Sequence, residues 1–317
     1  MSALSCAQAA AWLLERDHFL ILTHVRPDGD TVGCAAGLCQ GLREQGKTAF
    51  VLPNPEMTSL YTPYVEGMLS EDGWQPDTVV AVDVAARNML PENTAQYANR
   101  IDLTIDHHHS QEFYAQNTCL DGDRAACGEL IYEILRQWGP VSAQAAAPLY
   151  VAISTDTGCF VYSNTTPDTH RVAAELMAAG IPTAQLNKTH FRTKSFLRMK
   201  LESALIEGME LYENGTIAIV TQSLELMERL GATQRDAEDI SALVGQVEGV
   251  KTGITLRELK PGLCKLSVRT DPADLNASDV CAVLGGGGHS AAAGATVEAD
   301  IPGTKQAILQ AIRQVKG

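Results

Sequence analysis

Three short apolar runs of this chain are each followed by carboxylate or histidine side chains. FLILT precedes His24, Asp28 and Asp30, VVAV precedes Asp83, and LTI precedes the D-H-H run at 106–108. Runs that are apolar at every position are typical of parallel strands buried on both faces. Because parallel strands bring their carboxyl ends to one edge of a sheet, we expect an α/β fold with these side chains gathered at that edge.

A further acid, Asp156 in STDTG, is expected near the end of another strand at the same edge. Acids and histidines packed into one pocket would repel and desolvate one another unless cations compensated them. Carboxylate oxygens mixed with imidazole nitrogens suit Mn²⁺ or Mg²⁺, and the sequence has no C-x-x-C pair that would indicate structural zinc. The pattern therefore predicts a two-metal phosphoesterase site.

The order of these motifs resembles that of the DHH phosphoesterase family. The chain carries H-x3-D-x-D, a lone acid after the next apolar run, then D-H-H, and D-T-G at 156–158. Near the C-terminus, KLSVRTDP and VLGGGGHSAAAGA are similar to the DHH-associated domain with its GGGGH signature. The likeness spans essentially the whole chain. Its compact length is most similar to the branch of oligoribonucleases and pAp phosphatases, the nanoRNases.

The resemblance implies two divalent cations, manganese in preference to magnesium, each held by histidine and aspartate. The ligands of the first would be His24, Asp28 and Asp83. The ligands of the second would be Asp30, Asp83, His107 and Asp156. Asp83 would thus bridge the two ions, and a hydroxide shared between them would attack phosphorus in line.

The D-H-H motif is expected to contribute two more catalytic groups beside Asp83. By resemblance, His108 faces the substrate phosphate, where it would stabilise developing negative charge or protonate the leaving oxygen. Asp106 would orient the histidines by accepting their hydrogen bonds. The third histidine, His109, lies outside the family pattern and is expected to be an exposed loop residue.

The glycine run near the C-terminus is expected to bind the substrate. Glycines let backbone amides approach a phosphate closely, and the following HSAAAG is expected to begin a helix whose N-terminus would face it. An arginine fork and a histidine would complete a clamp for a distal phosphate or sugar. The expected substrate-binding residues are Arg269, Gly285, Gly286, Gly287, Gly288 and His289.

The length of 317 residues and the hydrophobic content of 45% are sufficient for two cores. We expect the DHH domain at 1–187, with a mainly parallel sheet flanked by helices. A connecting amphipathic helix is expected within 188–214. A smaller α/β domain with a mixed sheet, the DHH-associated domain, would occupy 215–317. By resemblance, the active site would lie in the cleft between the two domains.

Charge and cysteine content limit the partners and the compartment. A net charge of −14, from 24 basic and 38 acidic residues, argues against binding long nucleic acids, which need a basic track. The eight cysteines show no disulfide framework and are expected to be reduced. The N-terminal sequence lacks the pattern of a signal peptide, and no apolar stretch approaches the roughly 20 residues of a membrane span. We expect a cytoplasmic protein without a membrane partner, and a homodimer stays open.

The leading functional hypothesis is hydrolysis of short oligoribonucleotides to nucleoside 5′-monophosphates, together with conversion of 3′-phosphoadenosine 5′-phosphate (pAp) to AMP. One alternative is a phosphodiesterase for cyclic dinucleotides or for linear pApA and pGpG. Another is a non-catalytic nucleotide-binding sensor, although the residues of the metal-binding pattern are all present. A family II pyrophosphatase is disfavoured because its Arg-Lys-Lys run is absent, and a RecJ-type exonuclease because further domains would be required.

Overall fold

Six parallel strands form the sheet of the N-terminal unit. The computed structural model of the protein describes residues 2–237 and 240–316, and the chain divides into two units, Met1–Thr193 and Lys194–Gly317. The strands of the first sheet are β1 (Ser2–Ala3), β2 (Phe19–Leu22), β3 (Ala49–Val51), β4 (Thr78–Val82), β5 (Leu103–Asp106) and β6 (Asn117–Leu120). Their spatial order is β1-β6-β5-β4-β2-β3, and each pairing is parallel. The predicted parallel α/β fold is confirmed.

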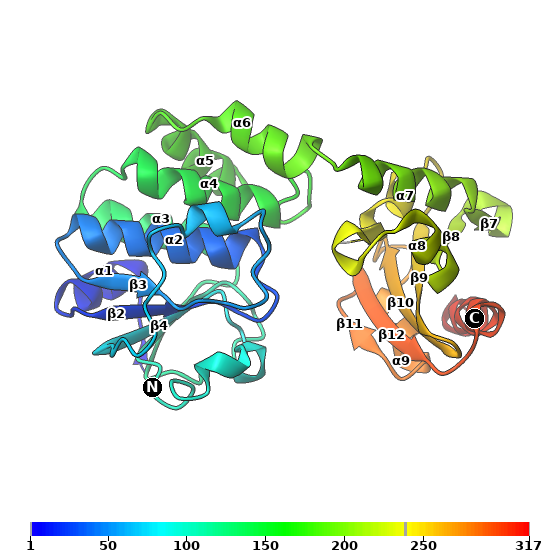
Figure 1. Cartoon of the computed structure of the whole chain (residues 1–317), viewed down its shortest axis with the longest axis horizontal. Coiled ribbons are helices and arrows are strands. Elements are labelled where there is room, and N and C mark those ends of the chain that lie inside the picture. Colours follow the sequence, from blue (N-terminus) through cyan, green and yellow to red (C-terminus); the bar gives the residue numbers. More distant parts are fainter. Residues whose placement is uncertain (1, 238–239, 317) are drawn as a thin grey trace. The chain divides into compact units, whose positions relative to one another are not determined.

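Helices cover one face of this sheet (Figure 1). They are α1 (Cys6–Leu14), α2 (Gly29–Glu44), α3 (Cys127–Leu135), α4 (Ala143–Asp156), α5 (Pro167–Ala178) and α6 (Thr183–Asn187). The side chains of alternate β2 residues point to opposite faces of the sheet, because a strand is pleated. Phe19 and Ile21 pack into the core beneath the helices, whereas Leu20 and Leu22 face a second cluster with Tyr97 in irregular segments. Apolar runs in these strands thus reflect burial on both sides.

Close packing of α2 against α4 rests on a glycine at every fourth position of α2. A Cβ at Gly29 would lie 2.3 Å from the Thr155 hydroxyl oxygen, and a Cβ at Gly33 would lie 2.3 Å from the Pro148 carbonyl oxygen. Gly37 continues the same row of contacts, with a Leu149 methyl 2.6 Å from its would-be Cβ. Residues four apart share one helix face, so this row lets the two backbones approach closely.

A mixed sheet forms the C-terminal unit, as predicted. Its strands are β7 (Glu210–Tyr212), β8 (Ile217–Gln222), β9 (Thr252–Lys260), β10 (Leu263–Thr270), β11 (Gly287–Gly288) and β12 (Ala292–Val297). The spatial order is β11-β12-β10-β9-β8-β7, and β8 pairs with β9 in parallel while the other neighbours are antiparallel. Helices α9 (Ala277–Val283) and α10 (Ile301–Lys316) pack on one face, and α7 (Phe196–Glu207) and α8 (Leu224–Leu230) pack on the other.

The segment HSAAAG does not begin a helix, so that prediction was wrong. His289 and Ala292 bond to each other through both backbone groups, with N···O distances of 2.8 and 3.2 Å, and close a tight hairpin between β11 and β12. The alanines of the segment enter β12, where Ala293 and Ala295 pack into the core of the unit. Burial of these small side chains on the sheet outweighs their helix propensity.

Among the described residues, none of the helices is long and apolar enough to cross a membrane.

We predict that Gly33→Ala destabilises the N-terminal unit despite the higher helix propensity of alanine. The propensity gain is about 1 kcal/mol, but the new methyl would meet a backbone carbonyl that no side-chain rotation can move away. Overpacking of this kind costs about 1–3 kcal/mol. Denaturant unfolding should show a net loss for Gly33→Ala and almost none for Gly245→Ala, where the added methyl meets open space. An unchanged midpoint for Gly33→Ala would contradict the packing argument.

Candidate metal centre

Asp83 lies at the middle of the candidate site and in an unusual backbone conformation. It directly follows β4, its N–H bonds to the Ile105 carbonyl at 2.9 Å, and only 2% of its surface is exposed. Its φ of 57° is in the left-handed region, which non-glycine residues seldom adopt. Such strain persists where the surrounding structure enforces it, and it is common at functional sites. Here it places the carboxylate between two groups of side chains.

The first group comes from the loop between β2 and α2. The His24 Nε2 lies 3.6 Å from the Asp28 Oδ1 and 3.7 Å from the Asp83 Oδ2. Asp28 is also the N-cap of α2, where its Oδ1 accepts the N–H groups of Asp30 and Thr31. Capping explains why the helix begins here, and it fixes the carboxylate beside His24. The ligand atoms of His24, Asp28 and Asp83 lie within 4.8 Å of one another.

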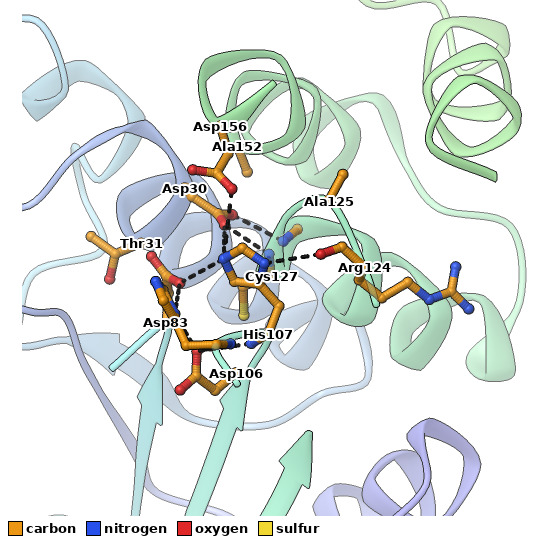
Figure 2. Close-up of polar contacts among 12 residues, drawn as sticks. Asp30, Thr31, Asp83, Asp106, His107, Arg124, Ala125, Cys127, Ala152 and Asp156 are labelled. Carbon is orange, nitrogen blue, oxygen red and sulfur yellow. Dashed lines mark hydrogen bonds and ion pairs between the residues drawn. The ribbon is translucent and has the colours of Figure 1, made fainter. Parts of the chain in front are cut away.

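The second group surrounds His107, which follows the end of β5. Its Nε2 lies 3.7 Å from the Asp30 Oδ2, 3.6 Å from the Asp83 Oδ1 and 3.6 Å from the Asp156 Oδ2. Figure 2 shows these carboxylates converging on the imidazole. The two oxygens of Asp83 therefore face different groups, Oδ2 toward His24 and Oδ1 toward His107. This is the arrangement expected of a carboxylate shared by two cations.

The distances and the hydrogen bonding fit metal coordination better than a hydrogen-bonded cluster. Separations of 3.6–3.7 Å between histidine nitrogens and carboxylate oxygens are too long for hydrogen bonds. Two ligand atoms on one cation, each about 2.1 Å from it, lie about 3.0–4.2 Å apart, depending on the angle between them. The Asp83 Oδ1 is buried and has no hydrogen-bond partner among the described residues. A buried carboxylate oxygen normally has a hydrogen-bond partner, and a bound cation would take the place of that partner.

Electrostatics lead to the same conclusion. Burial, together with the neighbouring acids, raises the pKa of Asp83 well above its usual range. Burial also raises the pKa of Asp30, and it raises the pKa of Asp156 to about 7. Burial opposes ionisation of Asp28 as well, yet the neighbouring imidazole of His24 holds the pKa of Asp28 below its ordinary value. Bound cations would favour the ionised form of all these groups, so the site as built demands positive charge.

Backbone carbonyls orient both imidazoles toward the carboxylates. The Nδ1 of His24 bonds to the Val25 carbonyl at 2.8 Å, and the Nδ1 of His107 bonds to the Arg124 carbonyl at 3.1 Å. The second of these bonds is drawn in Figure 2. With the proton held on Nδ1, each ring presents the lone pair of Nε2 to the site. Metal-ligating histidines are typically oriented in this way.

The buried Asp106 holds the two histidines of the D-H-H motif in place by accepting their hydrogen bonds. Its Oδ1 accepts the backbone N–H groups of His107 and His108 at 2.8 and 3.2 Å, and the His108 Nδ1 at 2.8 Å. Its Oδ2 accepts the side-chain amide of Gln111, which also bonds to the Val84 carbonyl at 3.0 Å. Gln111 has no signal in the sequence that would mark it, because its role depends on a buried partner.

The N-terminus of α3 holds Asp30 in place. The backbone N–H groups of Cys127 and Gly128 donate to the two carboxylate oxygens of Asp30 at 2.7 and 2.9 Å, and the Cys34 thiol donates at 3.2 Å. Free N–H groups at the start of a helix favour an anion. Sequence reasoning missed this support because backbone donors can belong to any residue type.

Asp156 is not at the end of a strand, so that expectation was wrong. It is the last residue of α4, and the loop that follows begins at Thr157. The glycine row on α2 brings the C-terminal end of α4 against the first turn of α2, where Gly29 meets Thr155. Helix packing therefore delivers Asp156 to the same place that the strands deliver Asp83 and His107.

The expected substrate-binding residues lie together in the C-terminal unit. Arg269 on β10 pairs with Ala292 on β12, and Ala292 bonds across the hairpin to His289. A Cβ at Gly286 would lie 2.2 Å from the Gly294 carbonyl oxygen, and one at Gly288 would lie 2.6 Å from the Ala293 Cα. These two glycines are thus required for the close strand pairing itself. The exposed His109 packs against Gly122, in agreement with its expected loop position.

Comparison with known proteins identifies the family. The model of the DHH family, N-terminal domain, matches residues 18–181. The chain belongs to the DHH family. It is 31% identical to the bifunctional oligoribonuclease and PAP phosphatase NrnA of Thermus thermophilus, over 93% of this chain and 89% of that protein. It is 26% identical to the Bacillus subtilis protein of the same name, over 89% of this chain and 90% of that protein.

The fold is also similar to a solved structure. An exopolyphosphatase-related protein from Bacteroides fragilis superposes with a TM-score of 0.87 at 22% identity, over 98% of this chain and 96% of that chain. The resemblance to the DHH phosphoesterase family that the motifs indicate is confirmed by the family model and by the Thermus thermophilus relative.

We predict that Mn²⁺ stabilises the metal-free protein and that Asp83→Asn removes most of this effect. A cation that binds only the folded state raises the free energy of unfolding by about 2.7 kcal/mol at one hundred times its Kd, and the melting temperature rises with it. Calorimetric titration should give two ions per chain for the wild type and fewer for the variant. Asp77→Asn, at an exposed carboxylate that pairs with His18, is the matched control. Equal manganese binding by Asp83→Asn would contradict the shared-ligand assignment.

Proposed function

We propose that this protein is a manganese-dependent phosphoesterase that hydrolyses short oligoribonucleotides to nucleoside 5′-monophosphates and pAp to AMP. The observation that carries the proposal is the position of Asp83, whose two oxygens face separate histidine–aspartate groups. Relatives that match nearly the whole chain bear the name bifunctional oligoribonuclease and PAP phosphatase. Magnesium is the alternative ion, because the donor set suits either cation.

The proposed ligands follow the two groups in the structure. His24, Asp28 and Asp83 would hold one cation, and Asp30, Asp83, His107 and Asp156 would hold the other. When bound, such a pair of ions lowers the pKa of water and offsets the charge of the phosphoryl group. The chain contributes the fixed positions of these ligands, set by the Asp28 cap, the α3 N-terminus and the carbonyls that bond to the histidines.

His108 is the proposed donor to the substrate. Its bond to Asp106 raises the pKa of His108 above the ordinary value, so a larger fraction of the ring carries a proton near neutral pH. Its Nδ1 is occupied by Asp106, and its side chain is 36% exposed. The Nε2 would then hydrogen-bond to a phosphoryl oxygen or pass its proton to the leaving oxygen. Asp106 acts on the reaction only through the two histidines that it positions.

Substrate recognition is assigned to the C-terminal unit. We propose that Arg269 and His289 bind a distal phosphate or sugar and that the loop from Gly285 to Gly288 lies against it. Arg269 is exposed at the end of the sheet, and its guanidinium bonds to the Val268 carbonyl alone among described partners. In this proposal, residues 1–187 catalyse, 188–214 connect and 215–317 bind substrate.

The net charge of −14 supports small substrates. A protein that grips a long nucleic acid gains affinity by releasing counterions from many phosphates, which requires a basic track. A short substrate needs only the local positive groups at the metals and Arg269. All eight cysteines are free. This is typical of proteins in reducing compartments and supports a cytoplasmic location.

We predict manganese-dependent cleavage of short RNA and pAp but weak cleavage of long RNA. A panel of 5′-labelled dinucleotide, pentanucleotide, 24-mer, pAp, cyclic di-AMP and pyrophosphate, resolved over time, measures the preference. Asp83→Ala should abolish all of these activities, because both ligand groups lose a carboxylate oxygen. Activity confined to cyclic di-AMP would reassign the substrate, and tight nucleotide binding without hydrolysis would make the protein a sensor.

We predict that Arg269→Ala and His289→Ala reduce activity on nucleotides far more than on a small phosphodiester that lacks sugar and base. Loss of a charge-assisted hydrogen bond costs about 1.5–3 kcal/mol, or about 10- to 150-fold in kcat/KM. Lys265→Ala, at a partly exposed residue of the same strand, serves as the control. An equal loss on both kinds of substrate would mean that these residues do not recognise the nucleotide.

A further inference from the structure

The loop that follows Asp156 exposes two large apolar side chains in succession. Val161 is 79% exposed and Tyr162 is 56% exposed, and they are among the most exposed large apolar residues of the described chain. Isolated exposed apolar residues are ordinary on protein surfaces and need no explanation. This pair differs because it lies in the loop that leaves a proposed metal ligand.

The backbone of the loop is strained and firmly anchored. Gly158, Cys159 and Phe160 have φ values of 56°, 59° and 66°, three consecutive residues in the left-handed region. Non-glycine residues in this region are strained, and such residues cluster at ligand-binding sites. Phe160 stacks on His170 at 5.2 Å between ring centroids, which anchors the strained turn inward.

Hydrogen bonds fix the loop to the end of α4. The N–H groups of Val161 and Tyr162 donate to the Thr157 carbonyl at 2.9 and 3.0 Å. The side-chain amide of Asn164 donates to the Asp156 carbonyl at 3.1 Å and to the Ala125 carbonyl at 3.0 Å. These hydrogen bonds tie the loop, and with it the backbone of Tyr162, to the segment that bears Asp156.

The ring of Tyr162 lies directly over Gly158. A Cβ at Gly158 would meet three ring carbons of Tyr162 at 2.5–2.7 Å, so only glycine allows this contact. Gly158 is two residues from Asp156, and two residues span at most about 7 Å. One face of the ring is thus seated on the backbone beside the metal centre, and more than half of the residue remains open to solvent.

We propose that the exposed face of Tyr162 stacks on the nucleobase next to the scissile phosphate and thereby selects nucleotides over other phosphoesters. The inference rests on the proposed function, because it assumes that a phosphate of a short RNA or of pAp binds at the metals. A base is joined to its phosphate through a single sugar, and every base offers a flat face to an aromatic ring. Stacking of this kind tolerates any sequence, which suits an enzyme that degrades mixed short RNA.

The test compares an intact RNA dinucleotide with two abasic analogues, each of which has one base replaced by hydrogen. Tyr162→Ala should lower kcat/KM on the intact dinucleotide by about 5- to 150-fold, the effect of losing one base–aromatic stack. On one of the two analogues, the wild type and Tyr162→Ala should differ by less than about twofold, because the stacked base is already missing. Tyr162→Phe should retain most of the activity, whereas Tyr162→Leu should resemble Tyr162→Ala.

Manganese titration of each variant separates stacking from a structural role of the ring. The expected result is unchanged manganese affinity for Tyr162→Ala. Met177→Ala, at an exposed apolar position on α5, is the control for loss of surface apolar area. Equal losses on all three substrates, weakened manganese binding, or full activity of Tyr162→Ala would each overturn the stacking proposal. A wild type that cleaves neither dinucleotide nor pAp would instead overturn the proposed function, and the stacking proposal with it.

Discussion

The mutual repulsion of buried carboxylates is the constraint on which the rest of the structure depends. Asp83 and Asp30 are almost fully buried, and burial raises the pKa of each. Without cations, the carboxylates would take up protons. Their repulsion would fall, but the site would lose its negative charge. The supporting contacts act against that loss. Backbone amides at the start of α3 favour the anionic form of Asp30, and the Asp83 Oδ1, which has no hydrogen-bond partner among the described residues, stays available to a cation.

The glycines of α2 allow the helix packing on which the site also depends. The candidate metal centre requires the start of α2 and the last turn of α4 to lie against each other, because Asp28 and Asp30 lie at the start of α2 and Asp156 ends α4. Side chains on the facing surface would hold the two helices further apart. The row of glycines in α2 allows the two helices to approach closely, so the same packing that fills the core also brings the site residues together. A mutation that separates the helices would therefore affect stability and metal binding together.

The glycines of the C-terminal unit show how one motif can serve structure and binding at once. Gly286 and Gly288 are needed because the neighbouring strand passes too close for any Cβ. The hairpin that results brings His289 and Arg269 to either side of Ala292. The GGGGH signature is thus first a requirement of strand pairing. The proposed contact between this segment and a phosphate would use the surface that the paired strands form.

The sequence by itself determined the parallel sheet, the mixed sheet and the identity of the residues that meet at the metal centre. Apolar runs that end in acids indicate buried strands and the edge where their acids gather, and the resemblance of the ordered motifs to a family supplies the set of ligands. Only the tertiary structure decided that Asp156 arrives on a helix, that HSAAAG forms a hairpin, and that Gln111 and the amides of Cys127 and Gly128 support the acids. Each of these depends on a partner distant in the chain, or on backbone groups that all residue types share, so no local pattern records it.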